Sequence, residues 1–232
     1  MKITQGLRAS LLPFSIPLVV LSFILLLNTL LRLSLLIYTG IELAPLSLWP
    51  WVLAKGIWFD VVVASALTTP VIIYGALLPN RWRVSTWHKR LQSVWLFGSI
   101  FVLLFGAVSE FTFWIEFSNR LNFIALDYLI YTSEVIGNIR ESYPVGLILS
   151  TIAAIAFIVT LGIRALVGSE VNHSMGWRQR IASVLIATTV TGILIRSANI
   201  EQMEHSQNAY ASELSGNGLF TLAAAARRNE LD

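Results

Sequence analysis

The chain has 232 residues, of which 56% are hydrophobic and only 12% are charged, and its mean hydropathy is +0.71. Soluble globular domains carry about a quarter charged residues, so this composition excludes an ordinary soluble domain and indicates an integral membrane protein. The net charge of +3 is small, and the absence of cysteine excludes disulfides, thiolate metal sites and cysteine nucleophiles.

Residues 1–12 form a short basic lead, and an apolar run over residues 13–38 follows it. A basic start before an apolar core is also the pattern of a signal peptide. The apolar run here is about twice the usual signal length, and no small-x-small cleavage motif ends it. We therefore expect an uncleaved helix that crosses the membrane.

Four further apolar runs follow, at residues 51–78, 91–114, 145–167 and 181–195. A helix needs about 20 apolar residues to cross the roughly 30 Å of hydrocarbon in a bilayer, and only the last run is clearly shorter. Membrane β-strands would instead alternate apolar and polar residues over about ten positions. Because these runs are continuous, the sequence predicts an all-α integral membrane domain with five transmembrane helices over residues 1–195.

Basic residues are distributed unevenly between the two sides that five crossings define. Residues 1–12, 79–90 and 164–180 contain nine of the sixteen basic residues and one of the thirteen acidic residues. The positive-inside rule places such segments in the cytoplasm, so the sequence predicts a cytoplasmic N-terminus and an external C-terminus. The segment 109–144 and the tail 196–232 then lie outside.

The external segment 109–144 carries apolar residues at helical spacings of three and four, as at Leu121, Ile124 and Tyr128. We expect an interfacial amphipathic helix here, between the third and fourth crossings and ending before Pro144. One interpretation is that its apolar face only packs on the ends of the five helices. The other is a surface for a lipid headgroup or a docking domain. Its candidate residues are Arg120, Asp127, Tyr128, Glu134 and Arg140.

Two charged residues lie deep within the first two apolar runs. Arg32 lies about six residues from the outer end of its run, and Asp60 about nine residues from the outer end of the next. At about 1.5 Å per residue, both lie roughly 10 Å below the membrane surface. Charges at that depth usually face a partner or water. The sequence predicts an intramembrane ion pair between Arg32 and Asp60, with Lys55 as the competing partner of Asp60.

The external segments contain no recognisable catalytic set. The sequence shows no phosphate-binding glycine loop, nucleophile elbow or metal-ligand spacing, apart from a loose group of Glu201, Glu204 and His205 that is typical of a solvated helix face. Residues 215–218, with the sequence SGNG, are typical of a turn. The sequence therefore assigns no catalytic, cofactor-binding or metal-binding residue, and it contains no basic aromatic stripe for nucleic acid.

Three stretches resemble one known family. The outer loop of bacterial lipoteichoic-acid-synthase-like proteins is similar to the external stretch EFTFWIEFSNRLNFIALDYLIYTSEVIGNIRESYP. These proteins are membrane phosphoglycerol transferases or sulfatase-like proteins of the alkaline phosphatase superfamily. A motif of their second helix is similar to KGIWFD at residues 55–60, although a basic residue is expected in place of Trp58. The tail from Glu213 to Asp232 resembles the linker that leads into their catalytic domain.

The resemblance implies a five-helix domain in the bacterial cytoplasmic (inner) membrane, followed by a large external α/β domain. That second domain carries a threonine nucleophile and a divalent metal such as manganese or magnesium, and it transfers phosphoglycerol or a related group from lipid. No position of this chain matches it. The expected function is therefore a membrane anchor and lipid-substrate-presenting domain, catalytically inactive alone, with residues 196–232 as the external linker. Its expected partners are membrane lipids, including anionic phospholipid headgroups, and a missing or separately encoded catalytic domain.

The sequence leaves two other functions open. One is a small transport or lipid-flipping protein, in which Arg32 and Asp60 line a path, and the other is a scaffold subunit. A transporter should show inverted repeats or broken helices, and five crossings without internal similarity argue against that function.

Overall fold

A computed structural model describes residues 15–83, 85–130, 132–167, 175–204 and 208–229, and these residues contain helices but no strand. Five of the helices are long and apolar enough to cross a membrane. The expectation of an all-α, multi-pass membrane protein is confirmed at this level.

The five long helices match the five apolar runs. They are α2 (Ser15–Thr39), α3 (Trp49–Leu77), α5 (Thr86–Phe117), α8 (Val145–Val167) and α9 (Trp177–Ser197). The bounds of α8 are those expected, whereas α9 extends beyond the apolar run at both ends. Its added turns carry the basic residues Arg178, Arg180 and Arg196. Long basic side chains can lie along an apolar helix while their charged ends reach polar surroundings, so they prolong a membrane helix at little cost.

Shorter elements connect and follow the long helices. They are η2 (Leu46–Leu48), α4 (Asn80–Arg83), α6 (Phe123–Ile130), α7 (Thr132–Ser142), η4 (Ile200–Met203), α10 (Ala209–Ser215) and α11 (Gly218–Asn229). The segment between α5 and α8 contains α6 and α7, on either side of residue 131, which lies outside the described residues. Ser118 ends α5 in the left-handed conformation, with φ at 53°, and its N–H donates to the Trp114 carbonyl at 2.8 Å.

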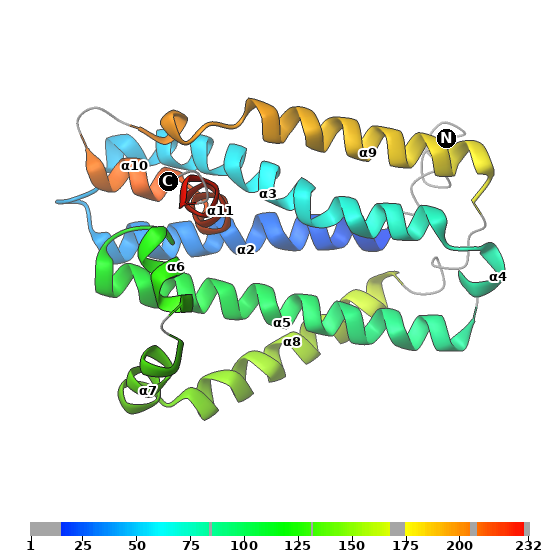
Figure 1. Ribbon diagram of the computed structural model, residues 1–232, viewed down its shortest axis with the longest axis horizontal. Coiled ribbons are helices and arrows are strands. Elements are labelled where there is room, and N and C mark those ends of the chain that lie inside the picture. The colour runs from blue at the N-terminus through cyan, green and yellow to red at the C-terminus, as the bar shows by residue number, and fades with distance from the viewer. Residues whose placement is uncertain (1–14, 84, 131, 168–174, 205–207, 230–232) are drawn as a thin grey trace.

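The long helices lie in a row in the order α9, α3, α2, α5 and α8 (Figure 1). Each helix runs opposite to the one before it in the chain. We call one end of the row the α4 end, since it holds α4 and the start of α2. We call the other the α10 end, since it holds α6, α7 and α10 (Figure 1).

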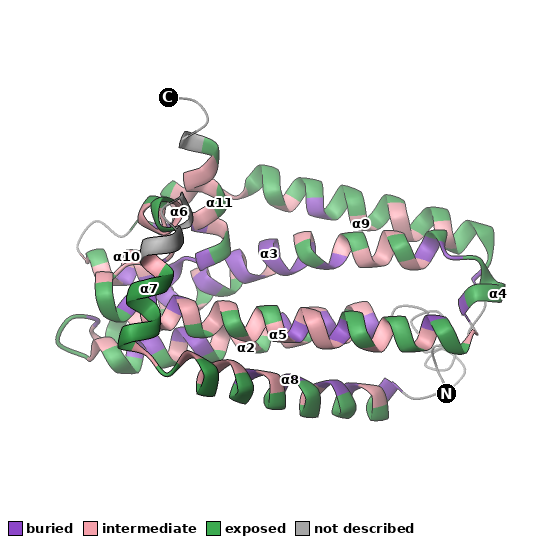
Figure 2. Cartoon of the chain, turned by 60° about the horizontal axis from the view of Figure 1, so that its bottom comes forward, coloured by how far each residue is buried: buried purple, intermediate pink, exposed green. Residues whose placement is uncertain are grey.

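Two clusters of buried apolar side chains hold α2, α3, α5 and α8 together. The first joins α2, α3, α5 and α8 and includes Ile24, Ala64, Leu96 and Ala156. The second lies toward the α10 end and includes Leu35, Val52, Trp114, Ala211 and Leu214. The C-terminal segment thus contributes to the packed interior. Figure 2 shows buried residues where helices face one another and exposed residues along the outer side of α9, which carries apolar side chains such as Leu185 and Ile193.

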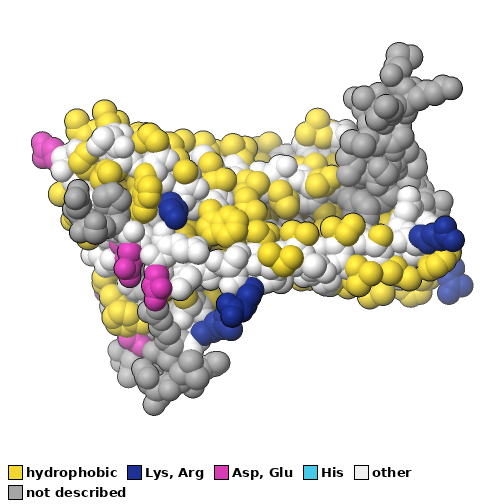
Figure 3. All heavy atoms as spheres, turned by 90° about the horizontal axis from the view of Figure 1, so that it is seen from above, with side chains coloured by type: hydrophobic (Ala, Val, Ile, Leu, Met, Phe, Trp, Pro, Cys, Tyr) yellow, Lys and Arg dark blue, Asp and Glu magenta, His cyan; other side chains and the backbone are white. Residues whose placement is uncertain are grey.

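Charged side chains differ between the two ends. Figure 3 shows Lys and Arg side chains gathered at the α4 end, whereas the Asp and Glu side chains visible in this view lie toward the α10 end, together with further basic ones. The described basic residues near the α4 end include Arg81, Arg83, Lys89, Arg90 and Arg180. They belong to segments that the sequence places on the cytoplasmic side.

Candidate functional site

The turn at residues 214–218, between α10 and α11, lies among α2, α3 and α5 instead of extending away from them. α10 packs against α3 and α2, and α11 packs against α6 and α3. The turn residues Leu214, Ser215 and Asn217 are buried. Buried backbone carbonyls need hydrogen-bond donors, and a turn exposes carbonyls that no helix satisfies. Arginine side chains from α2 and from the loop after α5 supply these donors.

Arg32 and Asp60 form the expected ion pair across α2 and α3. Nη1 of Arg32 lies 2.6 Å from Oδ2 of Asp60, and Nη2 lies 2.9 Å from Oδ1. Both residues are completely buried. The contact is the two-pronged arrangement in which a guanidinium recognises a carboxylate most strongly. Lys55, the competing partner of Asp60, is not the residue that the carboxylate pairs with.

The same ion pair holds the C-terminal turn. Nε of Arg32 donates to the Leu214 carbonyl at 3.0 Å, and Nη2 donates to the Gly216 carbonyl at 2.8 Å. Nδ2 of Asn217 donates to Oδ1 of Asp60 at 2.8 Å and to Oδ1 of Asn28 at 3.1 Å. Each charge therefore bonds both its partner and the turn. The two helices and the C-terminal segment share one closed polar network.

Gly56 leaves the space that the Arg32 guanidinium occupies. A Cβ atom built on Gly56 would overlap the Cζ and Nε atoms of Arg32. In the motif at residues 55–60, Gly56 therefore leaves space for the Arg32 side chain, and Asp60 supplies its counter-charge. Trp58, where the family resemblance leads one to expect a basic residue, donates through Nε1 to Oε1 of Gln202 at 3.3 Å.

A second buried ion pair joins Arg120 to Glu110. Nη1 of Arg120 donates to Oε1 of Glu110, and Nη2 donates to the Leu214 carbonyl at 3.3 Å. The backbone N–H of Arg120 donates to Oε2 of Glu213 at 3.1 Å. The Leu214 carbonyl thus accepts from Arg32 and from Arg120. Gly218 leaves room for the Glu110 carboxylate, which a Cβ atom there would overlap.

The position of Arg120 differs from the one expected from the sequence. Arg120 is only 1% exposed, so it is not part of a surface for a lipid headgroup. The reason is that α5 ends at Phe117 and the chain turns inward, toward Glu110 on its own last turns. The sequence signal for this pair was Glu110, which lies four positions before the expected end of an apolar run. A carboxylate at that depth in a membrane usually pairs with a cation.

Three other residues of the expected surface are exposed, unlike Arg120. Asp127 and Arg140 are exposed, on α6 and α7 respectively. Tyr128 is 42% exposed, and its ring lies edge-on to that of Phe117 at 5.7 Å. The side chain of Glu134 lies outside the described residues. The exposed members of the predicted headgroup surface thus lie on α6 and α7, whereas Arg120 is buried.

A cavity of about 450 Å³ lies beside the polar network, among α6, η4, α10 and α11. Its lining mixes apolar side chains, such as Phe123 and Met203, with the polar side chains of Asn122, Glu204 and Glu213. Glu213 therefore faces the cavity and also accepts the backbone N–H of Arg120. A cavity of this size and mixed lining is in the range of small-ligand sites.

Among the described residues there is no group of three His, Asp or Glu side chains that could hold a metal ion. The loose group suggested by the sequence includes His205, which lies outside those residues. The divalent metal that the family resemblance implies has no fitting ligand set in the described part of this chain, and we assign no chemical step through it.

Comparison with known proteins yields no relative: no family model, no curated protein and no solved structure matches this chain.

Proposed function

We propose that this chain is the membrane anchor and lipid-substrate-presenting domain of a phosphoglycerol or phosphoethanolamine transferase-like, or sulfatase-like, enzyme of the cell envelope. The observation that carries the proposal is the bonding of the C-terminal turn to Arg32 and Arg120. A tail that only tethered a domain would need no buried bonds. A tail that had to hold a catalytic domain at a set height above the membrane would be fixed to the helices in this way.

In this proposal the α4 end faces the cytoplasm and the α10 end faces outward. The support is the positive-inside rule, since Arg81, Arg83, Lys89, Arg90 and Arg180 all lie near the α4 end. The C-terminal segment then leaves the protein on the external side. α6 and α7 would lie in the external interfacial region, where Tyr128 and Arg140 suit the boundary between hydrocarbon and water.

The cavity beside Glu213 is our candidate for the place where the lipid headgroup is presented. It opens among the elements that carry the C-terminal turn, so a headgroup bound there would lie next to the start of any following domain. Its polar lining can hydrogen-bond glycerol or ethanolamine, and its apolar lining suits the first carbons of the lipid. Catalysis itself is assigned to a separate domain.

Two measurements test this function. The first is to sequence the DNA downstream of the codon for Asp232 and the neighbouring genes. An open reading frame there that encodes a metal-dependent hydrolase domain supports the proposal. The second incubates the purified 232-residue protein with manganese and phosphatidylglycerol labelled in its headgroup. We expect no release of glycerol phosphate. Metal-dependent turnover by this chain would show that it is an enzyme by itself.

A lipid-flipping protein is the competing function, and the network gives it less support. Charges that line a path need changing partners, whereas both oxygens of Asp60 and all three nitrogens of Arg32 already hold hydrogen bonds without exposure to solvent. Reconstitution into vesicles with fluorescent phospholipids decides the matter. Dithionite should quench only the outer-leaflet half of the label if the chain does not flip lipids.

A further inference from the structure

Three arginines near the α4 end bond to neutral acceptors. Nη1 of Arg180 donates to the carbonyls of Ala76 and Leu78, both at 2.9 Å. Arg164 donates to Oε1 of Gln92 at 3.2 Å and to the Lys89 carbonyl at 3.1 Å. A third arginine, Arg83, donates to the Gly75 carbonyl. Among the described residues no carboxylate forms an ion pair with any of the three.

Arg83 is the most confined of these arginines. It is only 6% exposed, and its Nε has no hydrogen-bond partner among the described residues. Burial, and after it the charge of Arg180, lower the pKa of Arg83 from its ordinary value. A buried guanidinium with a free donor and no counter-charge is costly, and an anion would relieve that cost.

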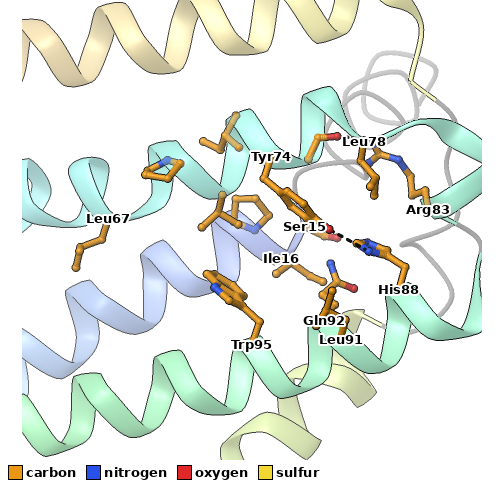
Figure 4. A pocket seen from close by; sticks show the side chains of 15 residues that line it. Ser15, Ile16, Leu67, Tyr74, Leu78, Arg83, His88, Leu91, Gln92 and Trp95 are labelled. Atoms are coloured by element: carbon orange, nitrogen blue, oxygen red, sulfur yellow. Dashed lines mark hydrogen bonds between the residues drawn. The ribbon is translucent and has the colours of Figure 1, made fainter.

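Arg83 lies at the edge of a cavity of about 430 Å³ between α2, α3 and α5 (Figure 4). Near Arg83 the lining is polar, with His88 and Gln92 from α5. Farther along α3 and α5 the lining is apolar, with Leu67, Pro70, Val71 and Trp95 among others. The cavity therefore has a cationic end toward the α4 end and an apolar end toward the middle of the membrane.

We propose that this cavity binds one anionic glycerophospholipid from the leaflet at the α4 end, with its phosphate on Arg83 and part of an acyl chain against Val71 and Trp95. Guanidinium groups recognise phosphate through paired hydrogen bonds, and Nε is one of the donors they use. The apolar lining suits hydrocarbon and would leave a free phosphate ion without contacts. The proposal needs only that the chain spans a membrane, so it stands or falls separately from the transferase function.

Lipid retention by the purified protein tests this site. Native mass spectrometry would compare bound phosphatidylglycerol and phosphatidylethanolamine of identical acyl chains, added in equal amounts in detergent. We expect one retained phosphatidylglycerol, and about a tenfold loss of that preference in Arg83→Gln, because the Arg83 charge attracts the net negative phosphatidylglycerol, whereas the ammonium of phosphatidylethanolamine offsets that attraction. Arg81→Gln removes the same charge from the same short helix, but at an exposed side chain, and should leave the preference unchanged.

A second variant covers the case in which Arg83→Gln fails to fold. Val71→Trp fills the apolar end without touching Arg83, and it should reduce retained lipid as strongly, while Val190→Trp on the exposed side of α9 should not. Unchanged retention in a folded Val71→Trp protein overturns the proposal.

A photo-crosslinking residue at Ile72, in the cavity lining, then identifies the occupant by mass. A phosphatidylglycerol adduct supports the site. A crosslink to a peptide of this chain would instead assign the cavity to the protein itself and refute lipid binding.

Discussion

The arginines at the two ends of this protein bond to different kinds of partner. At the α10 end, Arg32 is paired with Asp60 and Arg120 with Glu110, and both arginines also bond the carbonyl of Leu214. At the α4 end, Arg83, Arg164 and Arg180 bond neutral groups, and the described residues offer them no ion-pairing carboxylate. A buried charge that lacks an internal counter-charge must obtain one elsewhere or bear the cost.

The difference separates structural charge from charge that is available for a ligand. A closed network such as that of Arg32 has few free donors and fixes the helices and the C-terminal turn in one arrangement. A cluster such as that of Arg83 keeps a net positive charge at the α4 end, which is free to attract an anionic ligand. Mutation of the Arg32 network should therefore change the stability of the protein. Mutation of the Arg83 cluster should change which ligand the protein binds.

The largest expected effect is the loss of one partner from a buried pair. Arg32→Met leaves Asp60 buried without a counter-charge and should destabilise the protein by about 3–5 kcal/mol. The double variant Arg32→Met with Asp60→Leu should recover part of that loss, because it removes the orphaned charge as well. Unfolding by SDS in mixed micelles measures both. A double variant less stable than the single one would contradict the pairing.

A smaller effect follows from crowding the same guanidinium. Gly56→Ala places a Cβ where Arg32 lies, and overpacking of this kind costs about 1–3 kcal/mol. Gly98→Ala in α5 is the matched control, because a Cβ there meets no other atom within 4 Å. The control should be neutral, or stabilising by up to about 1 kcal/mol, since alanine favours a helix interior. Equal effects of the two substitutions would argue against the tight fit at Gly56.

Asn217→Ala weakens the link between the turn and the ion pair, together with the bonds that Oδ1 of Asn217 accepts from the backbone N–H groups of Leu219 and Phe220 at the start of α11. Asn217→Ala removes the bonds to Asp60 and Asn28 and should cost about 1–2 kcal/mol. It should also speed trypsin cleavage at the exposed Arg227, because α11 loses part of its attachment. Rates of limited proteolysis would be compared with those of Ser142→Ala, a change at an exposed residue of α7. Cleavage as slow as in the control would show that Asn217 does not hold the segment.

The smallest effect on stability is expected at the α4 end. Arg164→Gln removes only the bonds to Oε1 of Gln92 and to the Lys89 carbonyl, and because Arg164 is half-exposed, water can replace both acceptors, so the expected cost is about 1.5 kcal/mol. The change also reduces the repulsion among the basic residues. The same SDS titration should therefore show a much smaller shift than for Arg32→Met. A shift as large as that of Arg32→Met would remove the contrast between the two ends.

Much of the fold could be predicted because a bilayer constrains sequence directly. A helix that crosses a bilayer must be apolar over about 20 residues, and the five apolar runs found by this criterion correspond to the five long helices. The Arg32 and Asp60 pair followed from depth alone, since both lie about as far below the same surface.

The candidate site could be predicted only in part. Arg120 was expected on the surface and is buried, and its partner Glu110 was counted with the external segment. Nothing in the local pattern shows that the Leu214 carbonyl, far along the chain, accepts from Arg32 and Arg120. Such bonds depend on which distant backbone groups lack donors, and spacing within a helix does not encode that.

The sequence by itself therefore determined the all-α class of the protein, its five long apolar helices and the position of the charges along them, because each of these follows from the transfer of residues between water and hydrocarbon. Only the tertiary structure decided that the C-terminal turn enters the protein and closes the polar network. That decision depends on the matching of buried donors and acceptors between segments that are remote in the chain, Arg32 and Asp60 on one side and residues 214–218 on the other.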